Sequence, residues 1–182
     1  FRFLICLPAG ILNELSHGLF FEKLNYSENL TISFLGPAWA EELLKFAILY
    51  LIVLKRNEFN EPMDGLVYGV VVSLGFATYE NYSYVYELAI EWANKDNASP
   101  EVYSYVVALG RSYSAIPMHG LNGAVMGYYF GMYAFSGNKK FLLLSLLFPY
   151  LFHGFYNYLI YPSSMIIIVI LIIYSLYLHK IL

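Results

Sequence analysis

Ionisable and amide side chains interrupt four otherwise hydrophobic stretches of the sequence. In chain order these residues are Glu41, Glu42, Lys45, Glu80, Asn81, His119, Asn122, His153 and Asn157. A charged side chain in the hydrocarbon of a bilayer costs at least about 2.5–3.5 kcal/mol, so such residues usually lie inside a helix bundle and have a function. Because Glu and His are also the side chains that most often transfer protons, the pattern indicates acid–base chemistry at a buried site.

The spacing within each stretch limits which side chains can act together. Residues four apart share one face of a helix, so Glu41 can pair with Lys45, and His153 can act with Asn157. Glu41 and Glu42 are about 100° apart around a helix. We therefore expect one of these glutamates to face the centre of the site and the other to face a neighbouring helix.

The composition excludes several classes of protein. Hydrophobic residues make up 59% of the chain and charged residues 13%, whereas a soluble protein has about 25% charged residues. A net charge of −3 with ten Lys and Arg leaves no basic surface for nucleic acid. The single cysteine, Cys6, excludes an internal disulfide or a cysteine-based zinc site. The composition is typical of a polytopic membrane protein surrounded by lipid.

Six hydrophobic stretches have about the length that a helix needs to cross a bilayer. They run roughly over residues 1–21, 32–54, 64–92, 101–135, 140–161 and 163–181. We therefore predict an all-α fold, with residues 1–182 forming one transmembrane domain of about six helices. The fourth stretch is too long for one span, so we expect it to begin with a short interfacial helix and to break near Pro117. Since the chain begins at Phe1 rather than Met, we also expect the natural start to lie upstream.

Basic residues indicate how these helices are oriented. If the six stretches alternate, six basic residues lie on one side: Arg2, Lys55, Arg56, Lys139, Lys140 and Lys180. Only Lys23 and Lys95 lie on the other side. The positive-inside rule then places both ends of this fragment in the cytoplasm of a multi-pass cell-membrane protein.

The same alternation brings the polar groups to one depth, in the outer half of the membrane. With a rise of 1.5 Å per residue, the glutamates of the second and third stretches and the histidines of the fourth and fifth all reach it. We expect Glu41 or Glu42, together with His119 and His153, to lie within about 8 Å of one another. A stripe of glycines in the fourth stretch should let another helix pack closely. The stripe consists of Gly123, Gly127 and Gly131.

The polar segments resemble the motifs of the PrsW family of intramembrane proteases, within the wider group of CAAX-processing and bacteriocin-processing membrane proteases. The resemblance extends from about Gly36 to Tyr158. It rests on EELLK at 41–45, EPMDGLVYG at 61–69, FATYEN at 76–81, PMH at 117–119 and HGFYN at 153–157. Four of these segments follow in order on four separate hydrophobic stretches, which makes the resemblance specific.

The resemblance implies an intramembrane endopeptidase of a bacterial cell membrane. Its substrates would be single-span membrane proteins such as anti-sigma factors. Glu41 is expected to activate a water molecule and Glu42 to support it, although the sequence does not decide which glutamate is the base.

The remaining roles are divided among the other polar residues. His153 and Asn157 would stabilise the oxyanion, and His119 would orient the water or protonate the leaving amine. Glu80 would help to position the water, with Asn81 and Lys45 in support. The CAAX-processing relatives have a histidine where this chain has Glu80, so roles transfer least directly there.

Other mechanisms and classes remain open. Glu41, Glu80, His119 and His153 could instead hold a zinc ion with an open position for water. We favour the mechanism without a cofactor, because the resembling group implies it and Lys45 beside a glutamate disfavours a cation. A proton-coupled carrier would use the same residue types, but the sequence lacks the inverted repeats of many carriers. A non-catalytic membrane scaffold is a third class.

Three further ionisable residues receive no single role from the sequence. Glu14 and His17 are three residues apart in the first stretch and could face a cavity or form a structural pair. Arg111 near the start of the fourth stretch could be a structural anchor or could contact a substrate.

Overall fold

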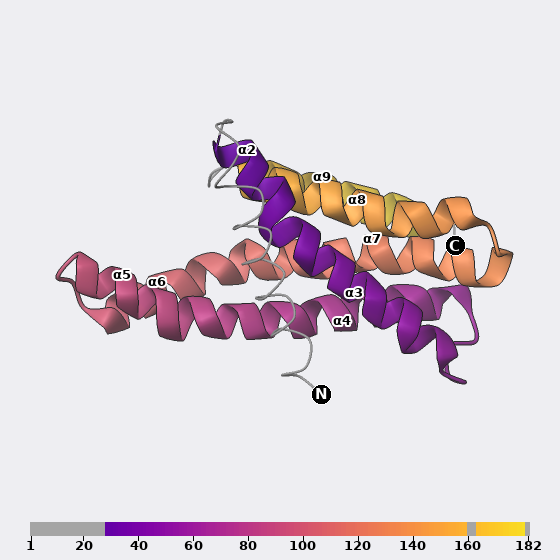
Figure 1. The fold of residues 1–182 in the computed structure, drawn as a ribbon, viewed down its shortest axis with the longest axis horizontal. Helices are drawn as coiled ribbons and strands as arrows, with labels where there is room; N and C mark the ends of the chain where they lie inside the picture. Colours follow the sequence, from indigo (N-terminus) through magenta and orange to yellow (C-terminus); the bar gives the residue numbers. More distant parts are fainter. Residues whose placement is uncertain (1–27, 160–162, 181–182) are drawn as a thin grey trace.

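The computed structural model describes residues 28–159 and 163–180, and every regular element in these two ranges is helical. The helices are α2 (Glu28–Ser33), α3 (Trp39–Leu51), α4 (Pro62–Ser83), α5 (Ala89–Lys95), α6 (Pro100–Tyr113), α7 (Ala115–Ser136), α8 (Lys139–Tyr158) and α9 (Met165–His179). Figure 1 shows them as a bundle around α7. The prediction of an all-α fold is therefore confirmed for the described residues.

An irregular turn, Phe34–Ala38, joins α2 to α3. Gly36 has non-helical backbone angles there, φ −90° and ψ −122°, and Pro37 follows it. Proline lacks an N–H group and disfavours helical angles in the preceding residue, so this pair ends α2 and allows α3 to start in a new direction. The Phe34 side chain packs against α8, where its ring meets Phe155 with centroids 5.1 Å apart.

Helices α4 and α7 pack so closely that their backbones touch. A Cβ atom added at Gly127 would lie 2.1 Å from the carbonyl oxygen of Gly65, and one at Gly123 would lie 2.5 Å from that of Gly69. No side chain fits in either place, so only glycine permits this crossing. The predicted packing role of the glycine stripe is confirmed.

A loop precedes α4, and its last residues form a cap for that helix. The carboxylate of Asp64 accepts hydrogen bonds from the backbone N–H groups of Asn60 (2.8 Å) and Glu61 (2.9 Å). Pro62 occupies the first helical position, where no N–H group is needed. The EPMDG segment, residues 61–65, therefore starts α4 and delivers Gly65 to the crossing with α7.

One wider helical turn, Tyr84–Leu88, continues α4 into α5, and α5 then forms an antiparallel hairpin with α6. The hairpin projects beyond the rest of the bundle (Figure 1). The helical conformation is interrupted between α6 and α7 at Ser114, where φ is −120° and ψ is −75°. The break predicted near Pro117 thus occurs three residues earlier, because Pro117 lies in the first turn of α7, where its missing N–H group does no harm.

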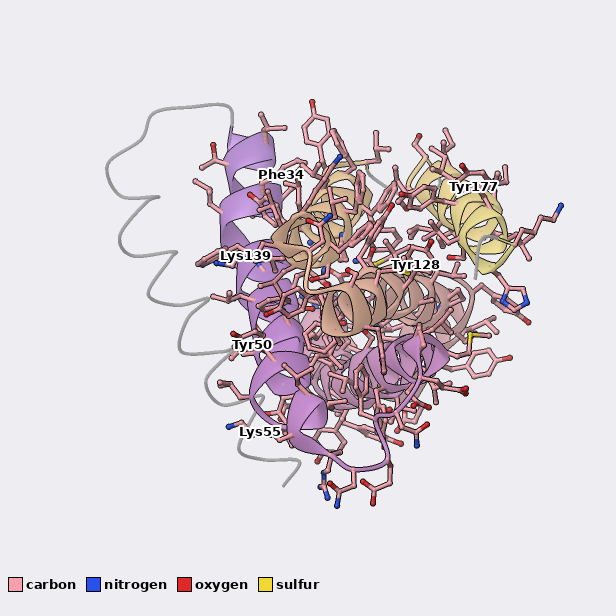
Figure 2. All side chains as sticks on the ribbon, turned by 90° about the vertical axis from the view of Figure 1, so that its right-hand side faces the viewer. Phe34, Tyr50, Lys55, Tyr128, Lys139 and Tyr177 are labelled. Atoms are coloured by element: carbon pink, nitrogen blue, oxygen red, sulfur yellow. The ribbon has the colours of Figure 1, made fainter. Side chains whose placement is uncertain are left out.

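The α3–α4 loop and the α7–α8 turn lie at the same end of the bundle (Figure 1). The ring of Phe59 from the loop stacks on Phe135 at the end of α7, with centroids 5.7 Å apart. Lys55 and Lys139 belong to these two connections, and Figure 2 views the molecule from this end. The predicted grouping of basic residues on one side is thus compatible with the fold.

None of the described helices combines the length and the apolar character of a candidate membrane span. The expected first span, residues 1–21, with Glu14 and His17, lies outside the described residues. The prediction of about six transmembrane helices therefore stays a prediction. Helix α9 packs against α7 and α8, where Val125, Ile168 and Leu171 are buried in the largest apolar cluster that the described residues form.

Candidate active site

Four helices bring the predicted polar residues into one buried cluster. Helix α3 contributes Glu41, Glu42 and Lys45, all within one turn and all buried. The other three helices contribute Glu80 from α4, His119 from α7 and His153 from α8. Ligand atoms of Glu41, His119 and His153 lie within 4.8 Å of one another. The predicted convergence is confirmed at the level of geometry.

His153 lies between the two glutamates of α3. Its Nδ1 atom is 2.8 Å from Oε1 of Glu42, and its Nε2 atom is 3.9 Å from Oε2 of Glu41. The expectation that only one of these glutamates faces the centre is wrong. An angle of 100° around a helix does not separate them, because the two nitrogens of the imidazole ring face different carboxylates, Nδ1 toward Glu42 and Nε2 toward Glu41.

Lys45 is fully buried and is the centre of the cluster's charge pairing. Its Nζ atom is 2.7 Å from Oε1 of Glu42 and 3.6 Å from Oε2 of Glu41, so the predicted pairing of Glu41 with Lys45 is present. The same atom is 3.0 Å from Nδ1 of His119. Since an ammonium group only donates, Nδ1 of His119 accepts and the ring proton is on Nε2.

That proton points at Glu80. Nε2 of His119 is 3.0 Å from Oε2 of Glu80, so the neutral imidazole donates to the carboxylate. Both nitrogens of His119 are therefore engaged, one by Lys45 and one by Glu80. His119 lies at the junction of the cluster and has no nitrogen left to protonate a leaving amine in this arrangement.

Arg111 closes the cluster from the end of α6. Its Nη2 atom donates to Oε2 of Glu80 and its Nε atom donates to Oδ1 of Asn81, each at 2.5 Å. The guanidinium carbon lies 4.0 Å from the ring centroid of Tyr84. Asn81 therefore braces Arg111 rather than Glu80, contrary to expectation. The sequence signalled Arg111 only as a charge close to a hydrophobic stretch, so its partners could not be named.

Two predicted amide groups differ in their placement. Asn157 is half-buried on α8 and makes no hydrogen bond with the described part of the chain, so its role at an oxyanion stays a prediction. Asn122 donates to the carbonyl of Pro149 at 2.8 Å and thereby ties α7 to α8.

Two carboxylate oxygens in the cluster are buried but receive no hydrogen bond from the described residues: Oε2 of Glu41 and Oε2 of Glu42. Buried polar atoms are nearly always partnered. Three carboxylates, those of Glu41, Glu42 and Glu80, share the two cations Lys45 and Arg111. The cluster has open acceptor positions beside Glu41, where water, substrate or a cation can bind.

Comparison with known proteins identifies the family of this chain. The profile described as "PrsW family intramembrane metalloprotease" matches residues 2–179. The chain belongs to the PrsW family. The resemblance inferred from the sequence motifs is confirmed.

Curated relatives carry the same family name. The chain is 33% identical over 160 residues to Protease PrsW of Clostridioides difficile, covering 86% of this chain and 63% of that protein. It is 38% identical over 136 residues to Protease PrsW of Bacillus subtilis, covering 73% of this chain and 56% of that protein. The chain thus spans between about half and two thirds of the length of the relatives it matches. No solved structure matched the chain significantly.

The PrsW family description names a metalloprotease, and the donor set of the cluster can be compared with that. Zinc takes nitrogen and carboxylate oxygen ligands, usually three from the protein at catalytic sites. Glu41, His119 and His153 supply such a set, and one oxygen of Glu41 receives no hydrogen bond from the described residues. Glu80 lies outside this group of three, so three of the four expected ligands fit a zinc ion.

Proposed function

We propose that this chain is the core of an intramembrane endopeptidase in a bacterial cell membrane. The single observation that supports this most is the gap between Oε2 of Glu41 and Nε2 of His153. These atoms are 3.9 Å apart, too far for a direct hydrogen bond and suited to a bridging water. The Glu41 oxygen receives no hydrogen bond from the described residues. A neutral His153 ring that donates from Nδ1 to Glu42 keeps a lone pair on Nε2 to accept from the water.

In this proposal Glu41 is the base. It removes one proton from the bridging water, while Nε2 of His153 accepts the hydrogen bond of the other proton. The water oxygen then attacks the carbonyl carbon of the peptide. The proton held on Glu41 passes to the leaving amine, so hydrolysis returns Glu41 to its starting form. Glu42 and Lys45 fix the ring of His153 and the carboxylate of Glu41, and Asn157 is our candidate donor to the oxyanion.

Zinc is the second candidate mechanism, and the group of Glu41, His119 and His153 favours it. These residues would hold the ion, which would lower the pKa of a bound water and polarise the carbonyl. His119 would then give up its bond to Lys45 or to Glu80. We favour the mechanism without metal, because the Lys45 ammonium is 3.0 Å from His119 and 3.6 Å from Glu41 and repels a dication there.

The substrate and location are part of the same proposal. We infer from the family resemblance that the enzyme cuts single-span membrane proteins such as anti-sigma factors. The basic residues predict a multi-pass protein with both ends of this fragment in the cytoplasm and the cluster toward the outer leaflet.

The test compares new protein N-termini in membranes of cells that express the wild type or Glu41→Gln at equal levels. Glu91→Gln, which changes an exposed carboxylate on α5, is the matched control. We expect a set of termini in single-span proteins that appears with the wild type and the control but not with Glu41→Gln. Identical profiles for all three would favour a proton-coupled carrier or a scaffold. Loss of the termini after chelator treatment, with recovery on adding zinc, would favour the metal mechanism.

A further inference from the structure

Among the described residues of the α5–α6 hairpin, only Arg111 makes a hydrogen bond or an ion pair with the cluster. It lies in the last turn of α6, directly before the break at Ser114. Its side chain is 15% exposed and that of Glu80 is 20% exposed, whereas Glu42, Lys45 and His119 are almost completely enclosed. The pair of Arg111 and Glu80 therefore forms the more open rim of the site.

From this rim a continuous chain of polar contacts runs to the centre. Arg111 donates to Glu80, Glu80 accepts from His119, and His119 accepts from Lys45. Lys45 then donates to Glu42, which also accepts from His153. Each link fixes the orientation of the next side chain, because every donor and acceptor in it has a defined direction.

The guanidinium is held on three sides, which leaves it little freedom. Two different nitrogens donate to Glu80 and Asn81, and the guanidinium carbon lies over the ring of Tyr84. A lysine at this position could keep the charge but could not match the planar fork or the stacking. The arrangement depends on arginine geometry as well as on positive charge.

We propose that Arg111 is a positioning residue of this site, which rests on the proposed peptidase function. Arg111 fixes the carboxylate of Glu80, and Glu80 fixes the His119 ring as a neutral donor whose Nδ1 faces Lys45. Without Arg111, a third carboxylate stands beside the cluster with no cation of its own. The His119 ring is then free to turn away from Glu80, and Lys45 loses one of the contacts that hold it between Glu41 and Glu42.

The first experiment needs no substrate. Nitrogen-15 NMR spectra of the histidine rings are recorded for the full protein in lipid nanodiscs, with the wild type, Arg111→Gln and Arg111→Lys. Lys95→Gln removes the exposed ion pair of the same hairpin and is the matched control. We expect the wild type and the control to show His119 as the neutral ring with its proton on Nε2. In Arg111→Gln we expect the nitrogen chemical shifts of His119 to move away from the values of this neutral Nε2–H ring.

The second experiment uses a substrate found through its new N-terminus. We expect Arg111→Gln to lower kcat about ten- to hundredfold, as a misplaced catalytic group does, while KM stays within about twofold. Arg111→Lys should recover part of kcat because it keeps a cation beside Glu80. Lys95→Gln should match the wild type.

Unchanged His119 signals and unchanged kcat in Arg111→Gln would overturn the proposal. A rise in KM alone would also overturn it, because that would make Arg111 a substrate contact. If Arg111→Gln does not fold, Asn81→Ala removes only one anchor of the guanidinium and should produce smaller changes of the same kind. If the wild type releases no new termini, the peptidase function fails, while the NMR comparison still tests the link between Arg111 and His119.

Discussion

At the scale of single residues, the two glutamates of α3 differ in how they are held. Oε1 of Glu42 accepts from both Lys45 and His153, at 2.7 and 2.8 Å. Glu41 has one ion pair at 3.6 Å and a buried oxygen that receives no hydrogen bond from the described residues. Glu42 therefore holds Lys45 and His153 in place. Glu41 has the carboxylate oxygen that is available to accept a proton from water.

This difference predicts opposite outcomes for two isosteric changes. Glu41→Gln should abolish cleavage and leave the thermal unfolding temperature unchanged or higher, because it removes a weakly paired buried charge. Glu42→Gln should lower activity and also destabilise the protein by about 1–3 kcal/mol, because Lys45 and His153 lose their charged acceptor. Activity assays and thermal unfolding in detergent measure both. A stability loss larger for Glu41→Gln than for Glu42→Gln would contradict the assignment.

Lys45 should be the most costly residue of the cluster to replace. Lys45→Met keeps most of the volume but leaves Glu41 and Glu42 without their shared cation. Removing one partner of a buried pair costs about 3–5 kcal/mol. Lys95→Met breaks an ion pair whose side chains are 67% and 56% exposed, and it should cost less than about 1 kcal/mol. Thermal unfolding of the two variants checks this, and equal melting temperatures would contradict it.

The sequence predicted that the glutamates and histidines meet, but it did not predict that Arg111 joins them, and it did not reveal how the residues pair. The i, i+4 spacing predicted the contact of Glu41 with Lys45, and similar depth in four helices predicted the cluster. The bonds of Glu42 to His153 and of Arg111 to Glu80 depend on the rotation of each helix about its axis. Nothing in the local pattern determines that rotation, so these pairs became visible only in the structure.

At the scale of helices, the α4–α7 crossing depends on backbone contact. A methyl group at Gly127 would lie 2.1 Å from a backbone oxygen that cannot move without moving α4. Both Glu80 and His119 are on this pair of helices, so their 3.0 Å contact depends on the same crossing.

Gly127→Ala should therefore separate α4 from α7 and destabilise the protein by about 1–3 kcal/mol or more. It should also lower activity by lengthening the contact of Glu80 with His119. Gly75→Ala is the matched control, because nothing lies within 4 Å of the added methyl group. That control should be neutral or stabilising by about 0.5–1 kcal/mol, as in other helices. Similar melting temperatures for the two variants would contradict the claim that α4 and α7 need glycine at position 127 to pack.

Helix existence was easier to predict than helix breaks. Long hydrophobic stretches predicted the regions of α3, α4, α7, α8 and α9, and the glycine stripe predicted a close neighbour. The break before α7 was expected near Pro117 but lies at Ser114, because a proline is tolerated in the first turn of a helix. The kink at Gly36 falls inside a stretch predicted to be one span, and hydrophobicity contains no information about it.

At the scale of the whole molecule, the connections divide between two ends of the bundle (Figure 1). The α7–α8 turn lies with the α3–α4 loop, and the α5–α6 turn lies at the opposite end. Together with the distribution of basic residues, this predicts which connections share a compartment.

Labelling of single cysteines tests that topology. In a Cys6→Ser background, Ser136→Cys should react with a membrane-impermeant maleimide only from the cytoplasmic side. Asn97→Cys, in the α5–α6 turn, should react only from outside. Both should react after the membrane is permeabilised, which controls for exposure. Labelling of both positions from the same side would contradict the predicted arrangement of spans.

The glycine crossing also limits how a peptide can reach the cluster. Because the backbones of α4 and α7 are in contact, this pair forms one fixed wall of the site. Helix α3, which carries Glu41 and Glu42, begins after the Gly36–Pro37 kink and packs against α4 and α8. If α3 moved away from α7 to admit a peptide, Glu41 would move away from His119. The return of α3 would bring the two residues together again. In an enzyme built in this way, the catalytic residues would be assembled only when α3 has returned over the bound substrate. The enzyme would not cut neighbouring membrane proteins while α3 is displaced.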